Sequence, residues 1–230
     1  MRKIILTAIA SMLISSAAYA GSFGVGITGA FVEISGSGTE TTTAGSIAGG
    51  AANTNTRSVD NRVGIPSGYL EYSLDPVSYA GTGITLGVKL TPGSADVSDK
   101  VISRTETAQG VSGTDASGSV TRKAQAEVEN LINYYLEIPL YQNMYVKLGH
   151  TTVDLNTLEN SITSSGTYGN TDVDGMNYGI GVKGESGNMI WKIAYEETDF
   201  DTINLTSTTS NKIKADLDTE ELNFSVGYKF

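Results

Sequence analysis

Residues 221–230 read ELNFSVGYKF and alternate polar and apolar side chains up to the last residue of the sequence. A period of two gives a β-strand one apolar face and one polar face. The apolar positions are Leu222, Phe224, Val226, Tyr228 and Phe230. Chain ends usually fray into a few polar residues, so a strand that stays complete to a terminal aromatic indicates that this strand has a partner.

The first twenty residues, MRKIILTAIASMLISSAAYA, have the three parts of a secretory signal peptide. A basic start is followed by an apolar run over 4–14 and by the small-residue pattern AYA. The run is about half of the ~20 apolar residues that a membrane-spanning helix needs. We therefore expect a signal peptide over residues 1–20, cleaved after Ala20, and a single mature domain over residues 21–230.

Composition narrows the class of protein further. The sequence has no cysteine, so an exported chain of this size must be stable without disulfides. Loss of Arg2 and Lys3 with the signal peptide leaves 13 Lys and Arg against 25 Asp and Glu, a formal charge of −12. This charge excludes nucleic acid as a partner and disfavours docking on anionic lipid through basic patches. No later segment approaches the ~20 apolar residues of a transmembrane helix.

Seven earlier segments show the same alternation as the last one. They are residues 23–31, 67–74, 83–90, 127–138, 143–150, 175–184 and 188–197. The short connections DPVSYAGT, PLYQ and ESGN carry turn residues. The four long connections, about 35–63, 91–126, 155–174 and 198–218, are rich in Thr, Ser, Gly, Asn and Asp. Short and long connections therefore alternate along the chain.

This sorting of the connections distinguishes two all-β folds. A soluble β-sandwich does not need it, whereas a transmembrane β-barrel has short turns at one end and long loops at the other. We predict an eight-stranded antiparallel up-and-down transmembrane β-barrel, in which the last strand closes on the first and leaves no open edge in lipid. A ten-stranded barrel, with residues 91–126 as an extra membrane hairpin, stays open as an alternative.

Residues 135–150, YLEIPLYQNMYVKLGH, together with the eight strands and the terminal Phe230, resemble the small OmpA/OmpX-like outer-membrane β-barrel family. The resemblance implies the outer membrane of a Gram-negative bacterium, with both termini periplasmic and with outer-membrane lipid and the barrel-assembly machinery as partners. It also implies a C-terminal assembly signal, formed by Phe224, Val226, Gly227, Tyr228 and Phe230. OmpA itself continues into a peptidoglycan-binding domain, so that role does not carry over to a sequence that ends with the barrel.

His150 is the only histidine and the first candidate for catalysis. Its parity with Leu148 predicts a lipid-facing side chain at the upper end of its strand, where Thr151 and Thr152 are the nearby hydroxyls. A nucleophile needs a base and an orienting carboxylate within hydrogen-bond reach, and no such set is recognisable. We expect a structural histidine at the membrane interface, no catalytic residue and no enzyme.

The segment NTDVDG places Asn170, Asp172, Asp174 and Gly175 at the spacing of the first half of a calcium loop. The twelfth position, where an EF-hand needs a bidentate Glu, is Gly181. We expect a turn here, and neither a metal site nor a cofactor.

The polar faces of the strands carry five Lys and six Glu that should point into the barrel. These are Glu71, Lys89, Glu137, Lys147, Lys183, Lys192, Glu196 and Glu221, together with Glu127, Glu129 and Lys229. The nearly balanced charge predicts a salt-bridged plug, because an ion-selective pore would show an excess of one sign.

The expected function is structural and interactive, with the external loops meeting an extracellular ligand, a cell surface or a phage, because loops on a rigid scaffold commonly carry recognition. A narrow, porin-like channel for small solutes is the main alternative. A lipid-modifying enzyme of the outer membrane is the third.

Overall fold

The computed structural model describes residues 21–42, 53–74, 83–99, 102–108, 118–160, 167–208 and 210–230. The signal-peptide segment lies outside these residues. The strands are β1 (Gly21–Thr42), β2 (Asn53–Leu74), β3 (Thr85–Asp96), β4 (Ile102–Ala108), β5 (Gly118–Pro139), β6 (Met144–Asn160), β7 (Thr171–Ser186), β8 (Met189–Phe200), β9 (Ile203–Thr206) and β10 (Lys212–Lys229). The described residues contain no helix long and apolar enough to span a membrane.

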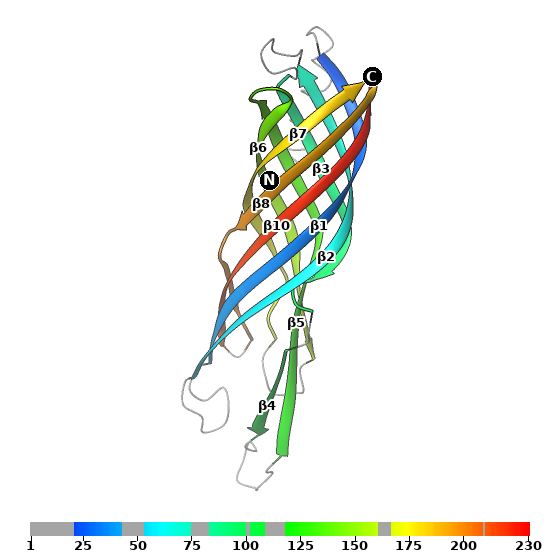
Figure 1. The fold of residues 1–230 in the computed structure, drawn as a ribbon. Coiled ribbons are helices and arrows are strands. Elements are labelled where there is room, and N and C mark those ends of the chain that lie inside the picture. The colour runs from blue at the N-terminus through cyan, green and yellow to red at the C-terminus, as the bar shows by residue number, and fades with distance from the viewer. Residues whose placement is uncertain are drawn as a thin grey trace.

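The strands form one antiparallel sheet that closes into a ring of eight (Figure 1). The order around the ring is β1-β2-β3-β5-β6-β7-β8-β10, and β10 returns to β1 in a register from Gly24↔Lys229 to Thr41↔Lys212. The Phe230 backbone N–H donates to the Phe23 carbonyl at 2.8 Å. The predicted eight-stranded antiparallel barrel is thereby confirmed, and the partner of the last strand is the first.

The two remaining strands lengthen the wall without entering the ring. β9 follows β8 and pairs with the outer part of β10. β4 follows β3 and pairs with β5 from Ile102↔Ala124 to Ala108↔Gly118. The hairpin considered within residues 91–126 therefore exists as an extension of the β3–β5 wall, and the ring keeps eight members.

A belt of exposed apolar side chains surrounds the half of the barrel that carries the short turns. Phe31 is 69% exposed and Ile27 is 66% exposed. The belt also includes Val25, Leu70, Leu86, Leu90, Leu148, Ile180, Trp191, Ile193, Leu222, Phe224 and Val226. So continuous an apolar surface is unfavourable in water and favourable in hydrocarbon. The barrel therefore spans the membrane with this belt.

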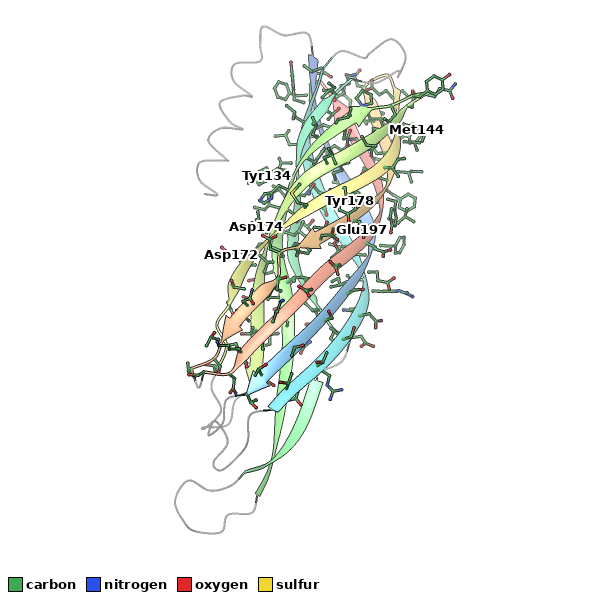
Figure 2. The ribbon with its side chains drawn as sticks, turned by 90° about the vertical axis from the view of Figure 1, so that its left-hand side faces the viewer. Tyr134, Met144, Asp172, Asp174, Tyr178 and Glu197 are labelled. Atoms are coloured by element: carbon green, nitrogen blue, oxygen red, sulfur yellow. The ribbon has the colours of Figure 1, made fainter. Side chains whose placement is uncertain are left out.

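The strands continue beyond the belt. In that part the inner face carries apolar side chains and the outer face carries charged ones. On β1, Phe31 faces out, Val32 and Ile34 are buried inside, and Glu33 lies outside with Arg62 at 3.0 Å. Figure 2 shows the same change on the other side of the barrel, where Met144 and Tyr178 give way to Asp174 in the direction away from the short turns.

An apolar cluster fills the barrel beyond the belt. Its buried members are Ala30, Val32, Ile34, Val97, Val153, Leu155, Val173, Phe200, Ile203 and Leu217. This part of the barrel is built like a water-soluble β-barrel, with apolar side chains inside and charged ones outside. We call it the extramembrane barrel.

The extramembrane barrel is formed largely by segments that were predicted to be long loops. Much of 35–63, 91–126, 155–174 and 198–218 is strand, since β1 runs to Thr42, β2 starts at Asn53, β5 starts at Gly118, β6 runs to Asn160 and β10 starts at Lys212. The alternation continues through these segments, but its phase reverses where the surroundings change from lipid to water. Strands predicted from the apolar residues of the lipid-facing side alone are therefore too short.

A β-bulge in β5 changes the orientation of two predicted lumen residues. The ladder with β6 shifts between Glu129 and Ile132, and Asn130 has a φ of 53°. Beyond the shift Val128 packs against the inner apolar cluster. Glu127 and Glu129 therefore lie on the outer face, where Glu129 accepts a hydrogen bond from the Asn156 amide at 2.7 Å. Their predicted inward orientation was wrong.

Candidate functional site

The interior of the membrane-spanning half holds eight charged side chains from seven strands. Each is 2–7% exposed. They are Glu71 on β2, Lys89 on β3, Glu137 on β5, Lys147 on β6, Lys183 on β7, Lys192 and Glu196 on β8, and Glu221 on β10. We call these eight residues the lumen network. Lys229 stands apart from it, at the short-turn rim, where its ammonium lies 2.7 Å from Glu185.

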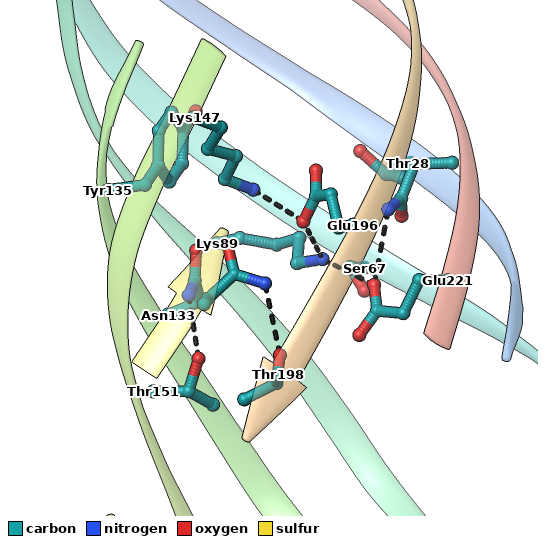
Figure 3. Close-up of polar contacts among 12 residues, drawn as sticks. Thr28, Ser67, Lys89, Asn133, Tyr135, Lys147, Thr151, Glu196, Thr198 and Glu221 are labelled. Atoms are coloured by element: carbon teal, nitrogen blue, oxygen red, sulfur yellow. Dashed lines mark hydrogen bonds and ion pairs between the residues drawn. The ribbon is translucent and has the colours of Figure 1, made fainter. Parts of the chain in front are cut away.

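One half of the lumen network contains Lys89, Lys147, Glu196 and Glu221 (Figure 3). The Glu196 carboxylate accepts from Lys147 at 2.7 Å and from Lys89 at 3.3 Å. Lys89 also donates to Glu221 at 2.7 Å, and the Asn223 amide donates to the same carboxylate at 3.2 Å. Two cations and two anions therefore form one continuous chain.

The other half contains Lys183, Lys192, Glu71 and Glu137. Lys192 bridges both carboxylates, donating to Glu71 and to Glu137, the latter at 2.6 Å. Lys183 donates to Glu137 at 3.1 Å and to the Thr85 hydroxyl at 2.8 Å. This half again holds two positive and two negative charges, so the lumen network is formally neutral.

Inward-facing tyrosines connect the two halves. The Tyr135 hydroxyl donates to Glu71 at 3.1 Å, while the Lys147 ammonium lies 4.4 Å from the centre of the Tyr135 ring. The Lys192 ammonium lies 5.1 Å from the centre of the Tyr69 ring. Cation–π contacts of this kind add to the ion pairs where water is excluded. The tyrosines were not among the predicted network residues.

Glycine on the facing strands makes room for these rings. A Cβ at Gly227 would lie 2.2 Å from the Tyr69 hydroxyl, and one at Gly26 would lie 2.5 Å from the same ring. The inward tyrosine and the glycines of two neighbouring strands are one packing unit. A sequence signal could have revealed this packing unit: a Tyr at an inward-facing position of one strand together with Gly at inward-facing positions of other strands.

Hydrogen-bonded amides lie between the lumen network and the apolar cluster. Asn133 donates to the Thr151 hydroxyl at 2.7 Å, and Asn177 donates to Thr198 at 3.0 Å (Figure 3). A cavity of about 20 Å³ adjoins the charges, and one of about 40 Å³ lies among the apolar side chains. A single water needs roughly 10–15 Å³, so these spaces admit waters and nothing the size of a nutrient.

His150 lies on the outer face of β6, with its Nε2 atom 3.6 Å from the Asp174 carboxylate and its side chain 44% exposed. The Thr151 hydroxyl is on the opposite, inner face, bonded to Asn133. The two side chains lie side by side at the edge of the belt.

The candidate calcium segment is a strand. Asp172 and Asp174 are alternate residues of β7, so successive carboxylates are ~7 Å apart along the backbone. Asn170 exchanges hydrogen bonds with β6 instead, donating to Asn156 at 2.7 Å and accepting from the Thr157 N–H at 3.1 Å. The segment does not wrap around a point as a calcium loop must. Across the described ranges, no group of three or more His, Cys, Asp or Glu is arranged to hold a metal.

The residues of the expected assembly signal divide between the two faces of β10. Phe224, Val226, Tyr228 and Phe230 face lipid, and the rings of the last two lie 5.1 Å apart. Gly227 faces inward against Tyr69. The packing of the barrel therefore accounts for each of them without reference to assembly.

Comparison with known proteins finds remote likenesses among solved structures. No protein-family model matches the chain, and no curated protein sequence does. Ail, the attachment invasion locus protein of Yersinia pestis, crystallised with the heparin analogue sucrose octasulfate, is 11% identical, with a TM-score of 0.44 over 91% of this chain and 97% of that one.

Two further structures are similar to the same degree. Neisserial surface protein A is 13% identical, with a TM-score of 0.39 over 91% of this chain and 99% of that one. The outer membrane protease OmpT from Escherichia coli is 8% identical, with a TM-score of 0.43 over 91% and 97%. Likeness at this level identifies neither a family nor an activity.

Proposed function

We propose that the protein is an OmpA/OmpX-like barrel of the Gram-negative outer membrane that conducts no solutes and acts through its extracellular surface. The observation that carries this proposal is the double filling of the interior. The membrane-spanning half is closed by eight paired charges, and the extramembrane barrel is closed by the apolar cluster.

Opening either layer to let a solute pass is costly. An eight-stranded barrel has an interior that side chains can fill. A solute would have to separate buried ion pairs, and unpairing one buried charge costs roughly 3–5 kcal/mol. It would then have to displace packed apolar side chains. The network also has no net charge that would attract one sign of ion.

The extramembrane barrel supplies what a surface role requires. β1 continues for ten residues beyond the belt, from Glu33 to Thr42. At a rise of about 3.4 Å per residue and a tilt of about 40°, this lifts the end of the strand roughly 25 Å above the lipid. The connections are thereby held away from the head groups, on a rigid support. In this orientation both termini lie in the periplasm.

We also propose that the protein acts by binding and not by catalysis. His150 has a carboxylate partner in Asp174, but the adjacent Thr151 hydroxyl faces the interior. A nucleophile in line with the histidine is therefore not provided by this neighbour.

Planar-bilayer recording of the purified mature protein tests the closed lumen, with a general porin inserted under the same conditions as the positive control. We expect no steady single-channel conductance. A reproducible open level would refute the proposal and favour the narrow channel. Cell fractionation and external protease digestion test the outer-membrane location and the outward orientation of the extramembrane barrel.

A further inference from the structure

The wall of the barrel is incomplete between the outer halves of β2 and β3. The ladder that joins these two strands runs no further outward than Gly68↔Leu90. β2 then continues in an unbroken ladder with β1 as far as Asn53, whereas β3 stays with β5. Among the described strands, residues 54–67 of β2 therefore pair with β1 alone. Figure 1 shows the outer ends of β2 and β5 lying apart.

Two prolines end the β2–β3 ladder. The Leu74 backbone N–H donates to the Ile84 carbonyl at 2.9 Å, so the even-numbered residues of β2 direct their N–H and C=O groups toward β3. The same register, carried outward, places Pro66 opposite Pro92 at a position where two N–H···O bonds would be exchanged. Proline has no N–H, so neither bond can form. The next residue of β3, Gly93, has a φ of 92° and lies in a bulge of the β3–β5 ladder, at which the strand bends.

A side-chain contact takes the place of the ladder further out. The Asn61 amide donates to the Asp96 carbonyl of β3 at 2.7 Å. In the described structure the N–H and C=O groups of the even-numbered residues from 56 to 62 have no strand partner on this side. We call residues 55–63 the open edge of β2. A row of unpaired backbone groups of this kind is a template for another strand.

The inward side chains of the open edge also lack a neighbour. Val59 and Val63 pack against the apolar cluster but stay partly exposed. Val32 and Ile34, at inward positions of β1, are only 6% and 2% exposed, because β1 has a strand on each side. A strand added beside β2 would cover Val59 and Val63 in the same way. The open edge is therefore suited to a strand with apolar residues on its inner face.

The outer face of the open edge carries charge. Arg62 is held by Glu33, with contacts of 3.0 and 3.1 Å to the two carboxylate oxygens. Asp60 is exposed on the same face, and a cation on an added strand would lie opposite it. The mature chain carries −12, so its surface as a whole attracts a basic segment.

We propose that the open edge of β2 binds an extended, basic and amphipathic segment of another protein as an added strand. This inference rests on the surface role proposed above and names its partner class. Main-chain hydrogen bonds to the even-numbered residues supply affinity, and the alternating apolar and basic side chains of the partner supply specificity.

A second copy in the same membrane does not fit this edge. Both barrels would stand with the same end outward, so a two-fold axis relating them would run along the membrane normal. Strands of such a barrel tilt by about 40°, and the two β2 strands would therefore cross at about 80°. Neighbouring strands of a sheet are rotated by only about 20–25°, so no ladder would form.

Binding is tested by fluorescence anisotropy with the mature protein in nanodiscs of zwitterionic lipid, and empty nanodiscs are the blank. The probe is a short labelled peptide that alternates lysine and valine. One control peptide alternates glutamate and valine. The other is the lysine–valine peptide with alternate backbone amides N-methylated, which cannot complete a ladder.

Matched variants separate the backbone of the edge from its charge. Ser58→Pro removes one N–H that points out of the open edge, and Ser58→Ala keeps it. Pro66 shows that β2 accommodates proline at an even position within its ladder with β1. Asp60→Asn removes the outward charge, and its control, Asp172→Asn, removes an exposed carboxylate of β7.

We expect the wild type to bind the lysine–valine peptide and neither control peptide. Ser58→Pro should weaken binding by roughly 10-fold, because one hydrogen bond is lost and the proline ring obstructs the incoming strand, whereas Ser58→Ala should change it less than about 2-fold. Asp60→Asn should weaken binding by about 2–5-fold, and Asp172→Asn should leave it unchanged. No binding by the wild type, equal binding by Ser58→Pro, or equal binding of either control peptide would overturn the proposal.

Hydrogen exchange measured by NMR gives a second test that does not depend on the variants. In the free protein the amides of residues 56, 58, 60 and 62 should exchange faster than those of residues 57, 59 and 61, which point toward β1. The lysine–valine peptide should slow the even-numbered set and leave the odd-numbered set unchanged. Equal protection of both sets, or none, would count against an added strand. These outcomes leave the bilayer recording unaffected, so the closed lumen and the open edge can fail separately.

Discussion

Reversing the charge of Lys147, a member of the lumen network, should destabilise the barrel more than the same reversal at a lysine outside the network. Its ammonium lies 2.7 Å from Glu196 and 4.4 Å from the centre of the Tyr135 ring, and its side chain is 4% exposed. In Lys147→Glu both contacts disappear, and a second carboxylate faces Glu196. Lys89, at 3.3 Å, still partners Glu196, which limits the loss. We expect a decrease of roughly 3–5 kcal/mol in the free energy of unfolding, the range for a broken buried pair.

Urea unfolding of the protein in lipid vesicles, followed by tryptophan fluorescence, measures this effect. The control is Lys212→Glu, an exposed position where the change should be less than about 1 kcal/mol. The double variant Lys147→Met with Glu196→Gln removes the pair without leaving an unpaired charge, and it should recover most of the stability. Equal midpoints for the two reversals, or a double variant as unstable as Lys147→Glu, would refute the electrostatic reasoning.

Three further results are expected. Gly227→Ala should lower stability by roughly 1–3 kcal/mol in the same unfolding assay, since a Cβ there meets the Tyr69 hydroxyl at 2.2 Å, whereas Gly29→Ala, where nothing lies within 4 Å, should not. Deleting Phe230 should reduce the amount of barrel in the outer membrane of cells while costing less than ~3 kcal/mol in vesicles; normal amounts in cells would contradict an assembly signal. Mass spectrometry of membrane-derived protein should find Gly21 at the N-terminus, and an intact Met1 would contradict the signal peptide.

The sequence predicts those parts of the fold in which the outer face of a strand lies in the same medium along its whole length. Every second residue from Leu222 to Phe230 faces lipid, so a period of two is visible, and the same holds for the belt of each ring strand. Inward Lys and Glu are then recognisable by parity alone. Glu71, Lys89 and six other charged residues have inward parity, and their side chains are buried inside the barrel.

The β5 bulge, the extramembrane barrel and the pairing of the lumen charges could not be predicted from parity. Parity assumes an unbroken ladder and one medium outside the barrel. The Asn130 bulge violates the first assumption, and nothing in the local sequence ENLIN distinguishes a left-handed Asn from an extended one. The change from lipid to water violates the second, since the inner face of β1 is polar at Thr28 and apolar at Val32 and Ile34. The pairing of each Lys with its Glu depends on the tilt and stagger of the strands, which emerge only on closure.

The reversal of the two faces also determines how deeply the barrel sits in the bilayer. Four ring strands change from an apolar or aromatic residue to a carboxylate within two positions on the outer face. The steps are Phe31 to Glu33, Met176 to Asp174, Tyr195 to Glu197, and Leu222 to Glu220. Sinking the barrel by one such step would drag four carboxylates into hydrocarbon, and raising it would expose four large side chains to water. Because either displacement is opposed on several sides of the barrel at once, the protein is held at one depth in the bilayer and has little freedom to tilt.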